Sequence, residues 1–211
     1  MDCVVEALGE PEIAGKPTPK FACLTPGWEF LADRQRDDYS QFGEDGLIQA
    51  VLERIGETNR WCFEVGAADG LFMSNTKRLR DSGWSAVLIE GDRNSADKCM
   101  AYASHRVQVV TERIGRHSLD NILTGSGAPI RLDLGVIDID GQDYWAWEGL
   151  KTFRPRVMLV EFMYTDDDFL PECGGAGQAG LNPIVQLGIA KGYVPVARTY
   201  CNVLFVDKQC L

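Results

Sequence analysis

The apolar positions of the chain follow two periods that alternate from about residue 40 to the end. Over 44–55 they recur at helical spacing and Gly56 follows, a pattern that predicts a helix before the first strand. The run 157–162 is almost entirely apolar, which is typical of a strand covered on both faces in a parallel sheet. Further strands are predicted at 61–65, 86–90, 107–111, 134–139, 193–199 and 202–206. Further helices are predicted from Ser74 to Gly83, at 95–104, 118–123 and 143–150, and from Asn182 to near Gly192, with Ser74 and Asn182 as N-caps.

These elements predict an α/β fold with five strand–helix units and a terminal pair of strands. We expect a doubly wound, Rossmann-like, mostly parallel seven-stranded sheet with a C-terminal antiparallel hairpin at 193–206. Ligands of such sheets bind at the carboxyl ends of the strands, beside the point where the strand order reverses. Every polar residue at a strand exit is therefore a candidate site residue.

The first 38 residues follow a different pattern, because proline and glycine recur there without a sustained period. They are predicted to form an N-terminal arm or lid (1–38), with an apolar patch around Trp28, Phe30 and Leu31 that docks on the main domain (39–211).

Composition narrows the class of protein. A length of 211 residues supports one domain, and a net charge of −10 argues against a nucleic-acid-binding module, which needs a basic face. The seven cysteines are an odd number without a CxxC pair, so we expect reduced thiols rather than a zinc ribbon or a disulfide framework. No run approaches the roughly 18 apolar residues of a membrane span, and the start has no leader pattern. A cytoplasmic protein without a membrane partner is expected.

The sharpest local signal is the segment 63–70, where small residues leave the first strand of the alternating region. Such residues let the backbone turn hard and approach a ligand closely. A dinucleotide fingerprint counted from Gly66 fails at Ala68 and at Leu71. At the tip of the next strand, the carboxylate of Glu90 can accept hydrogen bonds from both hydroxyls of a ribose.

Glu64, Gly66, Ala68 and Gly70 together resemble the first motif of the class I S-adenosyl-L-methionine (SAM)-dependent methyltransferases, with Ala68 where a glycine is usual. The resemblance implies that Glu64 lies near the methionine amino group and that the turn lies under the sulfonium and ribose. The expected cofactor is S-adenosyl-L-methionine, and the expected cofactor-binding residues are Gln41, Asp45, Glu64, Gly66, Ala67, Gly70, Asn75, Glu90, Asp92 and Asp138, with Ser40 as a further candidate.

A narrower resemblance begins at Asp138-Ile139-Asp140-Gly141-Gln142-Asp143-Tyr144 and continues at Val160-Glu161. These segments are similar to the fourth- and fifth-strand motifs of FkbM-type methyltransferases, and 40–45 and the closing hairpin fit the same family. The resemblance covers about residues 39–207. It implies O-methylation of a hydroxyl on a small molecule, natural product or glycan. N- or C-methylation of a small molecule, and a non-catalytic SAM-fold binding or scaffold domain, stay open as alternatives, and so does a homodimer.

Methyl transfer to a hydroxyl needs a base within hydrogen-bond reach of the acceptor. His105 and His117 are predicted to lie on the surface, so the catalytic candidates are the carboxylates Asp138, Asp140 and Glu161. Asp138 and Asp140 alternate with Ile139, so both can point to one side of the strand end. The same three carboxylates, with Asp166, could instead bind Mg²⁺, or serve structure or cofactor contact.

Three further features have a plain and a functional interpretation. The run Asp166-Asp167-Asp168 is a solvated turn or lines the acceptor pocket. The aromatic residues of 144–147 are core residues or stack on an acceptor ring. The glycine-rich segment 174–180 is a surface loop or a lid that orders on binding.

Overall fold

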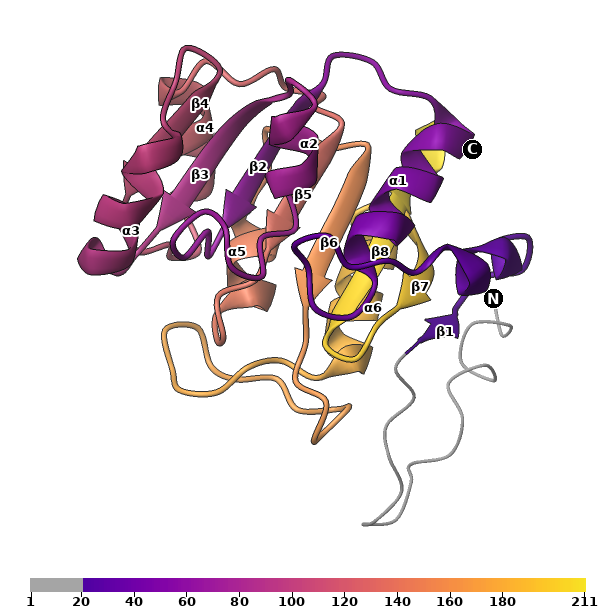
Figure 1. The fold of residues 1–211 in the computed structure, drawn as a ribbon. Helices are drawn as coiled ribbons and strands as arrows, with labels where there is room; N and C mark the ends of the chain where they lie inside the picture. The colour runs from indigo at the N-terminus through magenta and orange to yellow at the C-terminus, as the bar shows by residue number, and fades with distance from the viewer. Residues whose placement is uncertain (1–20) are drawn as a thin grey trace.

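The computed structural model describes residues 21–211, and within them a single mixed sheet has the strand order β1-β7-β8-β6-β5-β2-β3-β4 (Figure 1). The strands are β1 (Ala22–Cys23), β2 (Trp61–Val65), β3 (Ser85–Glu90), β4 (Val107–Thr111), β5 (Leu134–Ile137), β6 (Val157–Glu161), β7 (Tyr193–Arg198) and β8 (Asn202–Asp207). The α-helices are α1 (Glu44–Ile55), α2 (Lys77–Asp81), α3 (Arg93–Cys99), α4 (Leu119–Gly125), α5 (Asp143–Gly149) and α6 (Leu181–Ala190). Short 3₁₀ helices are η1 (Glu29–Arg34), η2 (Met100–Tyr102) and η3 (Lys208–Cys210).

The pairing of the strands confirms the predicted doubly wound α/β sheet with its C-terminal hairpin. Strands β4, β3, β2, β5 and β6 are parallel neighbours, whereas β8 pairs antiparallel with both β6 and β7. The sheet has one strand more than the seven predicted, because β1 pairs with the outer edge of β7, with Ala22 opposite Arg198. Two residues carry no readable period, so the sequence pattern did not indicate this strand.

Helices cover both faces of the sheet (Figure 1), and the side chains of each strand alternate between the two resulting cores. Phe63 and Val65 pack with α4, α5 and α6, whereas Cys62 packs with α1, α2 and α3. By the same alternation Glu64 points to the α1–α3 face. The exits of the parallel strands consequently bring polar groups of that face together at one edge.

Two helix starts differ from the prediction. Helix α2 begins at Lys77 rather than after a Ser74 cap, because the Ser74 hydroxyl donates to Glu64 instead of capping the helix. Helix α6 begins at Leu181, with Gly180 at the N-cap position. A Cβ on Gly180 would lie 2.0 Å from the carbonyl oxygen of Asp166, so this close approach of two backbones fixes the helix start.

The segment predicted as an arm falls into two parts. Residues 1–20 lie outside the described residues. Residues 21–38 contribute β1 and η1, and Leu31 is fully buried against α1. The Arg54 guanidinium lies 4.5 Å from the centre of the Trp28 ring, which is itself buried. Within residues 21–211, no helix is long and apolar enough to span a membrane.

A buried ion pair closes the edge of the sheet opposite the strand exits. The carboxylate of Asp133, before β5, accepts the backbone N–H groups of Thr58, Asn59 and Arg60 and an ion pair from Arg156 at 2.9 Å. These donors hold the pKa of Asp133 below its ordinary value in spite of its burial.

Asp133→Ala should lower the free energy of unfolding by about 3–5 kcal/mol, because the buried Arg156 guanidinium loses its carboxylate. Urea unfolding followed by circular dichroism measures this loss. Glu53→Ala, which removes an exposed pair with Arg34, is the control and should cost far less. Equal losses in the two variants would contradict this assignment.

Candidate functional site

The turn after β2 has the sharpest backbone constraint of the strand exits. Gly66, Ala68 and Gly70 have φ of 83°, 46° and 78°, the left-handed region that glycine adopts most readily. A Cβ on Gly66 would lie 1.7 Å from the carbonyl oxygen of Asp138, so only glycine fits there. The turn is thereby held directly against the exit of β5.

Six N–H groups of this turn are used inside the chain. Those of Gly66 and Ala67 donate to the carbonyl oxygen of Ile89, and that of Gly70 donates to Ala67. Three more donate to carboxylates: Ala68 to Glu90 at 2.8 Å, and Leu71 and Phe72 to Asp69 at 2.9 and 2.8 Å. The turn therefore presents two carboxylates, and the N–H of Asp69 is left without a hydrogen bond within residues 21–211.

Glu64 organises the loop that follows the turn. Its buried carboxylate accepts the hydroxyls of Ser74 and Thr76 at 2.8 and 2.5 Å and the backbone N–H of Asn75 at 2.7 Å. Burial raises the pKa of Glu64, while these donors and the nearby Arg80 oppose that rise. The geometry thus gives Glu64 a role in shaping the loop, and its contact with a methionine amino group stays a prediction.

Arg80, which the sequence did not single out, supports the same loop from α2. Its guanidinium donates to the carbonyl oxygen of Gly70 at 2.6 Å and to the Ser74 and Thr76 hydroxyls at 3.0 and 3.2 Å. The signal that could have identified it is a cation one turn into a helix that follows a glycine turn.

Three predicted cofactor residues lie around the turn with different surroundings. Glu90 ends β3 half-buried, and its second oxygen accepts the N–H of Asp92 at 2.7 Å. Asp92 is exposed and caps α3 by accepting the N–H of Ser95. Asn75 is buried in the loop before α2, and its N–H donates to Glu64. Each carboxylate oxygen of Glu90 accepts one bond, so lone pairs are left for a ligand.

The segment 38–45 forms a second loop at this edge. One oxygen of the buried Asp45 carboxylate accepts the N–H groups of Asp38, Tyr39 and Ser40 at 2.9, 2.7 and 2.8 Å. The Ser40 hydroxyl in turn accepts the N–H of Asp45 at 3.0 Å. Asp45 therefore shapes this loop, while Gln41 is exposed on it.

Carboxyl groups gather at the exits of β5 and β6. Asp143 is fully buried and accepts the N–H groups of Ile139 and Gly141 at 2.9 and 3.0 Å, so it folds the segment 138–143 onto itself. Burial raises its pKa to about 7. Asp140 is exposed with φ of 53°, and its N–H donates to Glu161 at 3.0 Å.

Asp138 and Glu161 share a hydrogen bond between their carboxyl groups, which lowers the pKa of Asp138 and raises that of Glu161. Burial, followed by the charge of Asp138, raises the pKa of Glu161 to about 10. Burial also raises the pKa of Asp138, to about 6. At neutral pH the proton therefore resides on Glu161, and Asp138 is the ionised partner.

Two further residues that the sequence did not indicate lie beside this pair. Glu44, at the start of α1, is buried and accepts the hydroxyl of Thr199 at 2.7 Å. Asn202 is opposite Glu161 in the β6–β8 register, and its Oδ1 is buried without a hydrogen-bond partner among residues 21–211. Glu44 lies in the segment 40–45 and Asn202 in the closing hairpin, which are notable only for their family resemblance. Nothing in the local sequence pattern marks either residue as a site residue.

The structure does not support the predicted Mg²⁺ site on Asp138, Asp140 and Glu161. Within residues 21–211, no group of three or more His, Cys, Asp or Glu side chains has an arrangement that could hold a metal ion. Asp140 and Asp166 are both exposed, whereas the Glu161 carboxyl is buried.

The glycine-rich loop is tied to the same segment through Gln142. The Gln142 side-chain amide donates to the carbonyl oxygen of Gly175 at 2.8 Å and accepts the N–H of Gly174 at 2.6 Å. Of the neighbouring aromatic residues, Trp147 is fully buried in the core, and the indole N–H of Trp145 donates to Pro171 at 2.9 Å. His105 and His117 are both exposed, as predicted.

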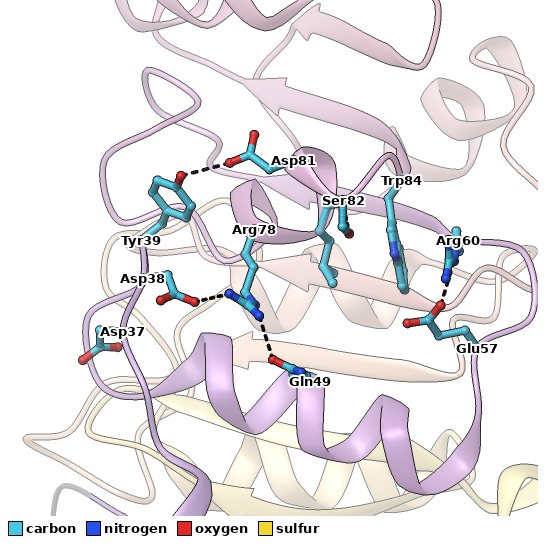
Figure 2. A pocket seen from close by; sticks show the side chains of 11 residues that line it. Asp37, Asp38, Tyr39, Gln49, Glu57, Arg60, Arg78, Asp81, Ser82 and Trp84 are labelled. Atoms are coloured by element: carbon cyan, nitrogen blue, oxygen red, sulfur yellow. Dashed lines mark hydrogen bonds and ion pairs between the residues drawn. The ribbon is translucent and has the colours of Figure 1, made fainter.

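Two grooves open near these elements. One, of about 480 Å³, lies between the loop at 38–42 and the segment Leu71–Met73, at the mouth of the strand exits. The other runs between α1 and α2, and Figure 2 shows that its polar side chains pair with one another. There Arg78 donates to Asp38 and Gln49, and the Tyr39 hydroxyl donates to Asp81. The first groove is the one next to the glycine turn.

No protein-family model matches the chain, and no curated protein matches it in sequence. Among solved structures it is similar to the precorrin-6y C5,15-methyltransferase from Geobacter metallireducens GS-15, with 11% identity, a TM-score of 0.51 and coverage of 82% of this chain and 93% of that one. It is also similar to the cofactor-bound Rv0187 from MTB, with 17% identity, a TM-score of 0.51 and coverage of 84% and 85%. An O-methyltransferase from Bacillus cereus in complex with SAH gives 19% identity, a TM-score of 0.48 and coverage of 85% and 90%. The first two likenesses show a shared α/β Rossmann-like fold.

Glu161→Gln should stabilise the protein at pH 8 by at least about 1.4 kcal/mol, the free energy of one pKa unit, and change it little near pH 4. The pKa of Glu161 is raised, so the stability that its proton contributes is complete below the ordinary 4.5 and is lost as pH rises toward about 10. Glutamine imitates the protonated form and removes this slope. Urea unfolding at both pH values measures it.

The exposed Glu172 provides the control, since Glu172→Gln should keep the pH dependence of the wild type. A gain in Glu161→Gln that is the same at both pH values would show that the proton is not held as described.

Proposed function

We propose that this chain is a SAM-dependent methyltransferase that methylates a hydroxyl of a small molecule, natural product or glycan. The observation that carries the proposal is the turn after β2, in which six N–H groups donate within the chain and three of these bonds are accepted by the carboxylates of Asp69 and Glu90. The fold by itself serves several cofactors, so the choice among them rests on the chemistry of this turn.

A dinucleotide places its pyrophosphate on free N–H donors at the start of a helix. This turn uses six of its N–H groups within the chain and sets the carboxylates of Asp69 and Glu90 beside them. Hydrogen bonds from backbone N–H groups lower the pKa of Asp69, so its charge is kept at neutral pH. Such surroundings repel phosphate. They favour a cofactor without phosphate that carries cationic groups, and SAM has both an ammonium and a sulfonium.

The residues fit this cofactor at three places. The carboxylate of Glu90 has free lone pairs at the tip of β3, where ribose hydroxyls would bind. Gly66 and Gly70 have the left-handed backbone of the turn after β2, and of the other predicted cofactor residues Gln41 and Asp92 are exposed and Asn75 is buried. When bound, SAM supplies an electrophilic methyl group.

Asp138 is the base that we assign to the reaction. Its carboxylate is ionised above a pH of about 6 and is placed beside the turn by the Gly66 contact. It can therefore accept the proton of an acceptor hydroxyl. Glu161 holds Asp138 through the shared proton and is a positioning residue. Alignment of the acceptor oxygen with the methyl group contributes the remaining rate enhancement.

The acceptor type rests on the resemblance of 138–144 and 160–161 to the FkbM-type methyltransferases, which favours O-methylation. The half-buried carboxylate of raised pKa suits that chemistry, because a hydroxyl must lose a proton as it is methylated.

Glu90→Ala should weaken the binding of S-adenosylhomocysteine by about tenfold or more, the equivalent of one hydrogen bond to a charged group of about 1.5 kcal/mol. Isothermal titration calorimetry measures the affinity, with NAD as the comparison ligand. We expect micromolar binding of S-adenosylhomocysteine to the wild type and none of NAD. Glu112→Ala, beyond the end of β4, is the matched control. Binding of NAD alone would refute the proposed function, and unchanged affinity in Glu90→Ala would remove Glu90 from the ribose site.

Asp138→Asn should lower the rate of methyl transfer by about 10²–10⁴-fold while the affinity for S-adenosylhomocysteine changes little. The rate is measured as S-adenosylhomocysteine released with a hydroxyl compound that the wild type accepts. In the wild type, kcat/KM should rise with pH as a group with a pKa near 6 ionises, and the variant should lack this rise. Equal losses of rate and affinity would make Asp138 a structural residue.

A further inference from the structure

Exposed apolar side chains gather at the edge of the sheet that carries the acids. Nine large hydrophobic side chains among the described residues are exposed, and six of them lie in the loops after β2 and β6: Leu71, Phe72, Met73, Tyr164, Phe169 and Leu170. Phe72 is 64% exposed and Tyr164 is 46% exposed. Scattered single residues would need no explanation, but this concentration on two loops does.

Aromatic contacts join the two loops into one surface. The rings of Phe42 and Tyr200 lie 5.1 Å apart between centroids, and those of Tyr200 and Tyr164 lie 4.4 Å apart. Phe42 in turn lines the groove that Leu71, Phe72 and Met73 border from the other side. We name this surface, made of Phe42, Leu71, Phe72, Met73, Tyr164 and Tyr200, the apolar rim.

The rim is fixed directly to the acid cluster. The N–H of Phe42 donates to the Glu44 carboxylate at 2.7 Å, and Thr199, next to Tyr200, donates to the same carboxylate. The N–H of Phe162 donates to the carbonyl oxygen of Cys201 at 2.7 Å, so the strand that ends at Glu161 continues into the rim. The rim and the acids at the exits of β5 and β6 therefore share the same backbone supports, Glu44 and the β6–β8 connection.

Acidic groups predominate around the rim, and one cation, Arg198, lies near Asp167. The N–H groups of Leu71 and Phe72 are bound to the Asp69 carboxylate. The exposed acidic run 166–168 follows Tyr164 by two residues. Below the rim, Asn202 Oδ1 is a buried acceptor without a donor among residues 21–211. Such a lining attracts a donor and repels an anion.

We infer that the acceptor of the proposed methyl transfer has an apolar or aromatic body and an uncharged or cationic head that donates hydrogen bonds, and that phosphorylated or carboxylated acceptors are rejected. This inference rests on the proposed function and narrows the class of hydroxyl compound that it uses. Within the small molecules and glycans left open above, it selects amphiphilic ring compounds over anionic sugars.

Three naphthalene probes test the inference, because they share one ring and differ in charge: 2-naphthol, 2-naphthylmethylammonium and 2-naphthyl phosphate. Their own fluorescence reports binding to the full chain in the presence of S-adenosylhomocysteine. The neutral and cationic probes should bind at least tenfold more tightly than the phosphate. Replacing both Asp166 and Asp168 with asparagine should reduce this difference severalfold, because the repulsion of the phosphate falls.

Phe72→Ser and Tyr164→Ser should each weaken 2-naphthol binding by about threefold to tenfold, the range that one aromatic contact supplies. Ile130→Ser is the matched control, since Ile130 is 59% exposed in the loop before β5, away from the strand exits, and its loss should leave the affinity unchanged. Thermal unfolding of each variant shows that it is folded.

The outcomes separate the two proposals. Phosphate binding as tight as naphthol binding, or equal losses in Phe72→Ser and Ile130→Ser, would overturn the assignment of the rim even if S-adenosylhomocysteine binds. Failure of S-adenosylhomocysteine to bind in calorimetry would instead overturn the proposed function, whatever the probes do.

Discussion

The burial of the Glu64 carboxylate is the constraint on which the rest of the site depends. A carboxylate without water needs donors, and the chain supplies them from Ser74, Asn75 and Thr76, three consecutive residues that must leave the helix to do so. Arg80 then fastens the same residues to Gly70. One buried carboxyl group on a central strand thus fixes the loop before α2 and, through Arg80, the glycine turn.

The second organising principle is the uneven use of hydrogen-bond donors at the strand exits. The carboxylates of Asp45, Asp69, Glu90 and Asp143 accept hydrogen bonds from backbone N–H groups. Asp138 and Glu161, at the exits of β5 and β6, have fewer such donors. These two carboxyl groups share a proton instead. The site is consequently rich in acceptors, which fits a cationic cofactor and a donating acceptor and opposes a phosphate.

The sequence predicted the architecture well, because the period of two in strands and of 3.6 in helices can be recognised from neighbouring residues. It also located the glycine turn and the acids at the strand exits. It did not reveal β1, since two residues have no period. It also missed the true starts of α2 and α6, because these depend on the contacts of Ser74 with Glu64 and of Gly180 with Asp166. The same limit explains the metal prediction: the spacing of Asp138 and Asp140 does not say that one carboxyl binds Glu161 and the other faces solvent. Asn202 gains its place beside Glu161 only through the pairing of β6 with β8, which the local sequence does not show.

The Gln142 side chain connects two segments that lie more than 30 residues apart in the sequence. Its amide joins the glycine-rich loop to the segment that carries Asp138, Asp140 and Asp143, so a displacement of the loop at this point breaks two hydrogen bonds. The loop richest in glycine is therefore anchored, by a side chain of the acid-bearing segment, at its least restrained residues.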